Sequence, residues 1–516
     1  MPVDDIATAT AASLDIGVEE FQRRVREEAE DLKSAVHDGT FDHPQAIVGL
    51  EYEFYAVVDD AGAVEPDGAL MRVPRRVLDY IGFEKELGMH NAEMSTSPQP
   101  LNEHGLAAQE AEIAARLRAA QAEVGVERMR LISDGMWTIP PAGATTAEYL
   151  TDSVEYEGIT IATNLSPDPR YHALSNSPQG ELAGKRLEGP HVSLSADTVM
   201  PQSLITSIQP HFQVPIAENL PTYFRYALRV AAPLLALGVN SPLYPPDLYD
   251  EDATAERILA DARMESRIDV FETTMNDPGG ESKVRFPADV ETVDEAIDRI
   301  VEDPPQALTD VERGTRFDHR FAHLGHKRGT YWRWVRPVFE GATPSEANAR
   351  VEFRPLPAQP TIRDTIAFQA AFAGLLRHMA TADHPAARLD WQVAHDNFYA
   401  AVRDGLDAEL VWITAGGTET SRTDEIYDDL FAAAMDGLRA RGLSESTAKE
   451  YLQPLRYRAT HRRTPARWKL DRVRRAIEDG TDFEEAVYRA QRRYFDRQRE
   501  TLFRGSFVDW PAPGRA

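Results

Sequence analysis

A strand-like run near the N-terminus, AIVGLEYEFYAVVD at residues 46–59, places two acids inside an otherwise apolar segment. Successive side chains of a β-strand point to opposite faces of the sheet, so Glu51 and Glu53 share one face. Two carboxylates on the same half-buried face repel each other unless cations or hydrogen-bond donors neutralise them. The run therefore predicts a sheet with one face on a hydrophobic core and a polar opposite face.

The rest of the chain mixes strands and helices without the regular alternation that builds a parallel sheet. Strand-like patterns surround HNAEMSTSPQPL, HVSLSAD, SLITSIQPHFQVP, TYWRWVRPVF and ARVEFRPLPAQP. Apolar residues at helical spacing predict helices over residues 17–36, 103–125, 219–238 and 361–380. Residues 246–315 are acidic and predicted to be rich in loops. These patterns favour an α+β fold with a largely antiparallel sheet flanked by helices.

A chain of 516 residues is too long for one small core and predicts a large domain with appended parts. We expect an N-terminal helical lead-in over residues 1–45, a central domain over 46–385 and a helical C-terminal portion over 386–516. The boundaries follow the change to strand-like patterning near residue 46 and the return to helical patterning after residue 385.

Acidic residues dominate the composition, with 84 Asp and Glu against 56 Lys and Arg and a formal net charge of −28. Hydrophobic residues still make up 42% of the chain, which is enough for a folded protein. Because the acids are spread along the sequence, we expect a soluble, halophilic protein whose self-repulsion is screened by concentrated salt. The same charge argues against nucleic acid as a partner.

The chain contains no cysteine, so any metal must be bound by oxygen and imidazole ligands. No apolar run reaches the length of a membrane span, and the N-terminus lacks the basic start and long apolar stretch of a signal peptide. We therefore expect a cytoplasmic protein without membrane association.

The common signatures G-x-x-x-x-G-K-[ST] and H-E-x-x-H do not occur. Four polar stretches in strand-like surroundings stand out instead. If one sheet brought them together, their acids and single imidazole would require cations. This donor set suits Mg²⁺ or Mn²⁺, which in turn suit bound phosphates. The four stretches are Glu51 with Glu53, Glu93, His211 with Gln213, and Glu352 with Arg354.

Each stretch also has a purely structural interpretation. An isolated E-x-E pair on a strand is most often part of a solvated sheet face. Glu93 fits a cap or surface acid, His211 fits a structural histidine, and Glu352 with Arg354 fits a cross-strand ion pair. The combination and order of the four stretches, rather than any single one, favour a functional site.

Several short segments occur in the order and approximate spacing of one enzyme family: GLEYEF, NAEMSTSPQPL, PHFQV, APLLALGVNSP, ESR, WRWVRP and RVEFRPLPAQPT. They resemble the glutamate–cysteine ligase family, whose catalytic domain is related to glutamine synthetase. The resemblance covers roughly residues 46–415. It implies a sheet of the glutamine synthetase type and a ligase that uses ATP with Mg²⁺, or Mn²⁺, to activate a carboxylate as an acyl phosphate. Glutamate is the implied acid and cysteine one option for the amine, which would place the chain in glutathione biosynthesis.

The resemblance also implies a role for individual residues. The metal ligands would be Glu51, Glu53, Glu93 and Glu352. The catalytic arginines, which would contact the transferred phosphate or the substrate carboxylate, would be Arg354 and Arg267. The residues that bind the cofactor or form the rim of the site would be His211, Gln213, Arg336, Asn397 and Arg403.

The sequence departs from the family pattern at Gln213, where many relatives have a second histidine, and this weakens the prediction of a metal ligand there. Members of the superfamily act on different amines, so small amino-acid substrates are expected but the amine stays open. The oligomeric state is also open, with a homodimer as one option. The alternatives are a ligase of the same fold with another amine, a catalytically silent relative that binds a nucleotide or metabolite, and, more distantly, a metal-dependent hydrolase.

Two further motifs allow more than one interpretation. The run HRFAHLGH places His319, His323 and His326 at helical spacing suited to zinc, although Gly325 and the following KRGTYW favour a loop. Residues 456–475 carry nine Lys or Arg against one Asp. A solvated basic helix that pairs with acidic neighbours is favoured there over a nucleic-acid patch, and a third option is that Arg462, Arg463 or Arg467 closes over the nucleotide.

Overall fold

The structure of the protein is a computed structural model. It describes residues 2–14, 17–59, 67–177, 185–276, 282–308, 311 and 314–511. Among the helices in these ranges, none combines the length and the apolar character needed to span a bilayer.

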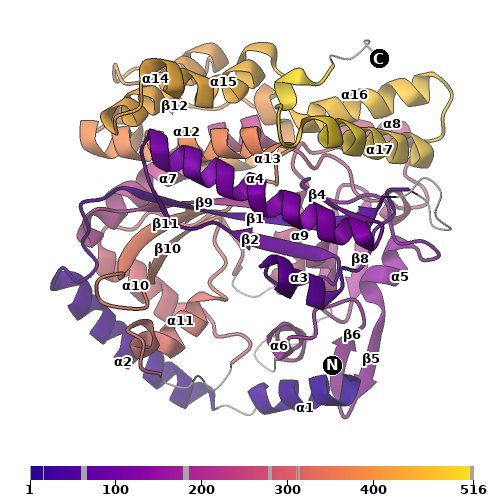
Figure 1. Ribbon diagram of the computed structural model, residues 1–516, viewed down its shortest axis with the longest axis horizontal. Coiled ribbons are helices and arrows are strands. Elements are labelled where there is room, and N and C mark those ends of the chain that lie inside the picture. Colours follow the sequence, from indigo (N-terminus) through magenta and orange to yellow (C-terminus); the bar gives the residue numbers. More distant parts are fainter. Residues whose placement is uncertain are drawn as a thin grey trace.

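The centre of the fold is a seven-stranded sheet built from β1 (Ile47–Val58), β2 (Asn91–Ser95), β3 (Gln99–Pro100), β4 (Met129–Ile132), β9 (Ile208–Gln213), β10 (Val335–Glu340) and β11 (Asn348–Phe353). Its main path runs β10–β11–β9–β1–β2, and β3 and β4 also pair with β1 (Figure 1). All of these pairs are antiparallel, which confirms the predicted α+β fold.

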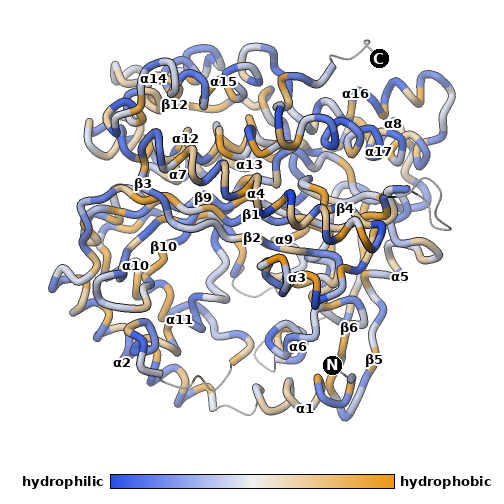
Figure 2. Tube along the Cα trace, viewed as in Figure 1, coloured by the Kyte–Doolittle hydropathy of each residue, from blue (hydrophilic) through white to orange (hydrophobic). Residues whose placement is uncertain are grey.

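One face of the sheet is covered by helices (Figure 1). The helices packed directly on it are α4 (Glu103–Val126), α7 (Leu220–Gly238) and α12 (Ile362–Ala382). Because α7 and α12 are buried on nearly all sides, they form the interior of this layer. Figure 2 shows hydrophobic residues along the central strands and these helices. Further out lie α13 (Trp391–Asp404), α14 (Thr423–Ala440), α15 (Glu445–His461), α16 (Pro465–Glu478) and α17 (Phe483–Thr501).

The opposite face of the sheet carries polar side chains. Along β1, Val48, Leu50 and Tyr52 are buried, whereas Glu51 and Glu53 occupy the alternate, partly exposed positions. The alternation confirms that the two acids share a face. The elements on this side are α1 (Val3–Leu14), α2 (Val18–His37), α3 (Arg75–Ile81), α6 (Pro169–Asn176), α10 (Val293–Glu302) and α11 (Ala322–Arg328) (Figure 1).

The other α-helices and β-strands of the described chain are shorter. They are α5 (Thr146–Thr151), β5 (Ser153–Tyr156), β6 (Ile159–Ala162), β7 (Lys185–Gly189), β8 (Val192–Ala196), α8 (Ala255–Asp261), α9 (Arg267–Met275), β12 (Trp412–Ile413) and β13 (Glu419–Thr420).

Three sequence predictions of local structure were wrong. Residues 246–315 contain α8, α9 and α10 rather than mainly loops, because apolar positions such as Val293, Ile297 and Ile300 recur at helical spacing between the acids. The loop expected around Gly325 is the short helix α11. The C-terminal portion is not wholly helical, since β12 and β13 form a hairpin.

The basic stretch 456–475 pairs with acids of the same chain. Arg458 is fully buried and donates to Asp364 Oδ1 at 2.7 Å and to Gln359 Oε1 at 2.7 Å. Lys469 is buried against Asp134 at 2.5 Å. Two more exposed members of the stretch, Arg462 and Arg467, are both bonded to Asp407. The structure therefore supports the predicted pairing with acids for these residues, but the stretch is not one solvated helix, because it spans α15 and α16 and its Arg458 and Lys469 are buried.

The Arg458–Asp364 pair should contribute strongly to stability. Arg458→Met leaves the Asp364 carboxylate buried without its cation, and we expect the free energy of unfolding to fall by about 3–5 kcal/mol. Lys449→Met in the same helix is the matched control, because Lys449 pairs only with the exposed Glu445 and should change stability by less than about 1 kcal/mol. Denaturant unfolding in constant salt measures both, and equal small losses would contradict the prediction.

Candidate active site

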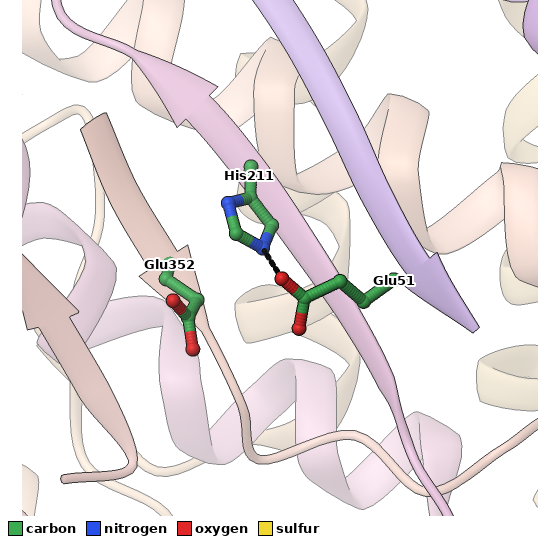
Figure 3. Close-up of side chains that lie close together, drawn as sticks. All are labelled: Glu51, His211 and Glu352. Atoms are coloured by element: carbon green, nitrogen blue, oxygen red, sulfur yellow. Dashed lines mark ion pairs between the residues drawn. The ribbon is translucent and has the colours of Figure 1, made fainter. Parts of the chain in front are cut away.

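Three side chains from neighbouring strands converge on the polar face of the sheet (Figure 3). They are Glu51 on β1, His211 on β9 and Glu352 on β11, and one potential ligand atom of each lies within 4.8 Å of the others. The register brings them together, because Glu352 stands directly opposite His211 and Glu51 stands opposite Gln209, two residues before His211. His211 Nε2 lies 3.2 Å from Glu51 Oε1 but forms no hydrogen bond.

Glu352 is held by two arginines. Arg336 Nε donates to Glu352 Oε1 at 2.8 Å, and Arg354 Nη1 donates to the same oxygen at 2.5 Å. Burial alone would raise the pKa of Glu352, but Arg336, Arg354 and His211 hold that pKa well below its usual range. Glu352 is therefore a carboxylate at neutral pH, although only 1% of it is exposed. Arg336 and Arg354, which were both predicted as site residues, therefore lie at the acid cluster.

A second group of acids lies beside the first. Glu53 stands opposite Glu93 in the β1–β2 register and accepts hydrogen bonds from Ser207 N at 2.6 Å and Gln209 Nε2 at 2.9 Å. Burial, and next the Glu86 carboxylate, raise the pKa of Glu53 to about 7. Burial and the neighbouring carboxylates also raise the pKa of Glu93 well above its usual range, and its side chain hydrogen-bonds with that of Glu86.

These residues fit a divalent cation on their chemistry. The donors are carboxylate oxygens and one imidazole, the set that Mg²⁺ and Mn²⁺ accept. His211 Nε2 is a buried nitrogen without a hydrogen-bond partner among the described residues, and it points at Glu51. The raised pKa values of Glu53 and Glu93 come first from burial and then from neighbouring carboxylates, and a bound cation would favour the charged form of both acids.

A cleft of about 680 Å³ leads to Glu51, His211 and Glu352. Its walls carry several guanidinium groups, which make it suitable for a polyanion. Arg350 also contacts the cluster, because its Nε donates to His211 Nδ1 at 2.9 Å, and its Nη2 donates to Glu340 at 2.6 Å. Gln213 also lines the cleft, and its amide reaches Gln45 O at 3.4 Å. The arginines lining the cleft are Arg316, Arg328, Arg336 and Arg350.

Three predicted residues lie further from the cluster. Arg267 is 3% exposed and sits behind Arg354, where its Nη2 donates to the backbone oxygens of Arg354 and Pro355. The side-chain amide of Asn397 donates to Val411 O at 2.8 Å and accepts from Val411 N at 2.9 Å. The side chain of Arg403 is exposed on α13. Neither Asn397 nor Arg403 is among the described residues that line the cleft.

The histidines of the run HRFAHLGH bond to separate partners rather than converging on one metal site. His323 Nδ1 pairs with the buried Glu28 at 2.8 Å, and His326 Nε2 bonds to Ala307 O at 2.8 Å. His319 lies on a preceding 3₁₀ turn. In the part of the chain that the structure describes, the metal-type cluster is the one formed by Glu51, His211 and Glu352.

Sequence reasoning missed two residues of the site, Glu86 and Arg350. Glu86 lies in the loop before β2, seven residues ahead of Glu93, and has no periodic pattern around it. Arg350 had a detectable signal, because it lies two residues before Glu352 and must share its face of β11.

The chain is similar to known ligases. The sequence profile of glutamate–cysteine ligase family 2 matches residues 47–491. The similarity therefore extends past residue 415, which is where the resemblance expected from the short sequence segments ends. A search of curated protein sequences finds no match. A glutamate–cysteine ligase from Francisella tularensis in complex with AMP has a similar structure, with TM-score 0.50 and 12% identity over 91% of this chain and 92% of that one.

Two further structures are less similar. A bifunctional glutathione synthetase from Pasteurella multocida gives TM-score 0.47 and 14% identity over 91% of this chain and 55% of that one. The complex of the prokaryotic ubiquitin-like protein Pup with its ligase gives TM-score 0.37 and 10% identity over 92% of this chain and 72% of that one.

Proposed function

We propose that this chain, which belongs to glutamate–cysteine ligase family 2, is an ATP- and Mg²⁺-dependent carboxylate–amine ligase. It would activate a carboxylate, with glutamate as the favoured acid, as an acyl phosphate and join it to an amine to give a γ-glutamyl product. The observation that carries the proposal is the Glu51–His211–Glu352 cluster at the inner end of an arginine-lined cleft. Cysteine is one option for the amine, and it rests on the family likeness alone.

The residues of the site suit this chemistry. Glu51, His211 and Glu352, with Glu53, Glu86 and Glu93 beside them, would hold Mg²⁺. The bound ions would screen the phosphates of ATP and stabilise charge on the transferred phosphoryl group. Arg336 and Arg354 are fixed by Glu352, so their remaining N–H groups are already oriented before substrate arrives. Arg267 would position Arg354 through its backbone bond.

Hydroxylamine trapping tests the activation step. The enzyme, assayed in molar KCl because of its net charge of −28, should convert glutamate and ATP with hydroxylamine to the γ-glutamyl hydroxamate. Formation should require ATP, Mg²⁺ and the acid together. A protein that binds Mg·ATP yet yields no hydroxamate from glutamate or other amino acids would contradict the proposal and favour a silent relative.

Metal binding should release protons near neutral pH. Because burial and neighbouring acids raise the pKa of Glu53 to about 7 and raise that of Glu93 well above its usual range, these acids hold protons near pH 7 that a bound cation must displace. The apparent affinity for Mg²⁺ should therefore rise between pH 6 and pH 8, by up to about tenfold per pH unit for each proton released. Calorimetry in buffers of different ionisation enthalpy counts the protons, and a count of zero at pH 7 would contradict the raised pKa values.

ATP and free amino acids are cytoplasmic metabolites, and we propose that the enzyme works in the cytoplasm. Its partners would be small-molecule substrates rather than nucleic acid or membrane.

A further inference from the structure

Three arginines of the basic stretch 456–475 have no acidic partner in the part of the chain that the structure describes. The side chain of Arg472, on α16, forms neither a hydrogen bond nor an ion pair with the described residues, and its Nε is buried. The side chain of Arg475, one turn further along α16, is exposed and likewise unpaired among these residues. Arg463, just before α16, donates to a tyrosine hydroxyl and to two backbone oxygens, all of them neutral.

Helix α17 packs beside α16 and brings two more arginines near Arg472 (Figure 1). Arg497 pairs with Glu500 at 2.7 Å, whereas Arg493 Nη1 lies 3.9 Å from Asp496. Both of these acids are exposed, so solvent screens their charges. The α16–α17 arginine cluster therefore consists of Arg463, Arg472, Arg475, Arg493 and Arg497.

The surroundings of Arg472 show that this cluster lacks counter-charge. Burial, and next the other four arginines of the cluster, lower the pKa of Arg472 to about 10. Arg472 is still charged at neutral pH, so these arginines repel one another in the free protein. Asp471, the neighbouring acid in sequence, lies 3.9 Å from Arg474 instead. Acids outnumber bases by 84 to 56 in the whole chain, so the acid-rich composition does not account for such a cluster.

Arg472 is held in place although it has no polar partner. Its Cζ lies 4.2 Å from the centroid of the Trp468 ring, and Trp468 is 3% exposed. Arg475 follows three positions later, which places the two Cβ atoms about 5–6 Å apart on one side of the helix. Guanidinium groups present forked N–H donors that match phosphate oxygens, so neighbouring forks suit linked phosphate groups. The Trp468 ring is covered and offers no open face on which a nucleobase could stack.

We propose that the α16–α17 arginine cluster binds a small inorganic anion with two or more linked phosphate groups, such as pyrophosphate or tripolyphosphate. Arg463, Arg472 and Arg475 would donate to the phosphate oxygens. The cluster lies in the outer helical layer, whereas the arginine-lined cleft is on the opposite face of the sheet, and the two share no residue (Figure 1). This site therefore does not depend on the proposed ligase activity.

Calorimetric titration of the full chain with tripolyphosphate tests this site in constant molar KCl with EDTA. The chelator keeps metal ions from recruiting the probe to the cleft, and salt at about 1 M screens charges beyond about 3 Å, so direct contacts decide the affinity. We expect one saturable site per chain that binds tripolyphosphate at least tenfold more tightly than sulfate. CTP should bind no more tightly than tripolyphosphate, because the site offers its base nothing to stack on.

Binding should be unchanged in Arg336→Gln, because Arg336 lines only the cleft. Absence of saturable binding by the parent protein would overturn the proposal. Loss of binding in Arg336→Gln would place the probe in the cleft, and markedly tighter binding of CTP would show that the site recognises a nucleotide, so either result would also overturn it.

Variants of the cluster locate the site. Arg475→Gln and Arg472→Gln should each weaken tripolyphosphate by about tenfold. Arg475 is exposed and unpaired among the described residues, so its replacement should not disturb folding, and thermal melts without the probe check both variants. Arg474→Gln is the matched control in the same helix, because Arg474 reaches Leu259 O at 3.3 Å, away from the cluster, and it should leave binding unchanged.

Unchanged affinity in both cluster variants would refute the assignment. Size-exclusion chromatography of the same proteins tests a different occupant, the acidic surface of a second copy of this chain. Self-association that Arg475→Gln abolishes, in a protein that does not bind tripolyphosphate, would overturn the proposal in favour of that interface.

Discussion

Glu51→Gln should lower kcat by roughly 10³-fold or more at saturating Mg·ATP. A bound cation contributes several kcal/mol to stabilising transition-state charge, and glutamine keeps the shape of the side chain but loses the charge that holds the cation. Glu51 is the cleanest position for this test, because its one charged contact in the cluster is His211 at 3.2 Å. Steady-state assays across a range of Mg²⁺ concentrations measure the effect.

Glu84→Gln is the control for this substitution, because Glu84 lines the same cleft but is exposed and bonds to Ser95 at 3.0 Å. It should change kcat by less than about threefold. Near-normal turnover of Glu51→Gln at high Mg²⁺ would show that Glu51 is not a metal ligand. Glu53→Gln gives a second test of the same idea in the neighbouring group of acids.

Arg354→Gln should lower kcat by about 10²–10³-fold while leaving Mg²⁺ affinity within a few-fold of the parent protein. Arg354 is partly exposed and bonds Glu352 at 2.5 Å and Gln209 at 2.6 Å, and in the proposed reaction it would stabilise the negative charge that develops during phosphoryl transfer. The loss should appear in kcat rather than in the KM for ATP, since the interaction strengthens only in the transition state.

Arg354→Lys is the matched variant, because it keeps the charge and removes the fork geometry that lets one guanidinium reach both partners. We expect an intermediate loss of activity, with thermal melts used to confirm that both variants fold. A large rise in KM with unchanged kcat would show that Arg354 binds the ground state instead.

The sheet and its polar face could be predicted because they depend on local patterns. The alternation of β1 predicted the common face of Glu51 and Glu53, and the i, i+2 spacing of Glu352 at the end of β11 and Arg354 just after it predicted that these two lie together. Long helices such as α7 and α12 followed from their continuous apolar spacing. Family resemblance then linked segments that lie far apart in sequence.

Other features depend on contacts that no local pattern reveals. Glu86 joins the site through a loop whose path is set by tertiary packing, and the role of Asn397 in holding Val411 is likewise a long-range contact. The histidines of α11 have helical spacing, but their partners Glu28 and Ala307 come from other segments. Residue type and spacing could not identify those partners.

The most direct test of the account is ADP release by the purified chain in molar KCl with Mg·ATP, glutamate and a panel of amines that includes cysteine. Turnover should require both glutamate and an amine, with stoichiometric γ-glutamyl product. ATP binding without ADP release for every pairing of acid and amine would contradict a ligase at the Glu51–His211–Glu352 cluster.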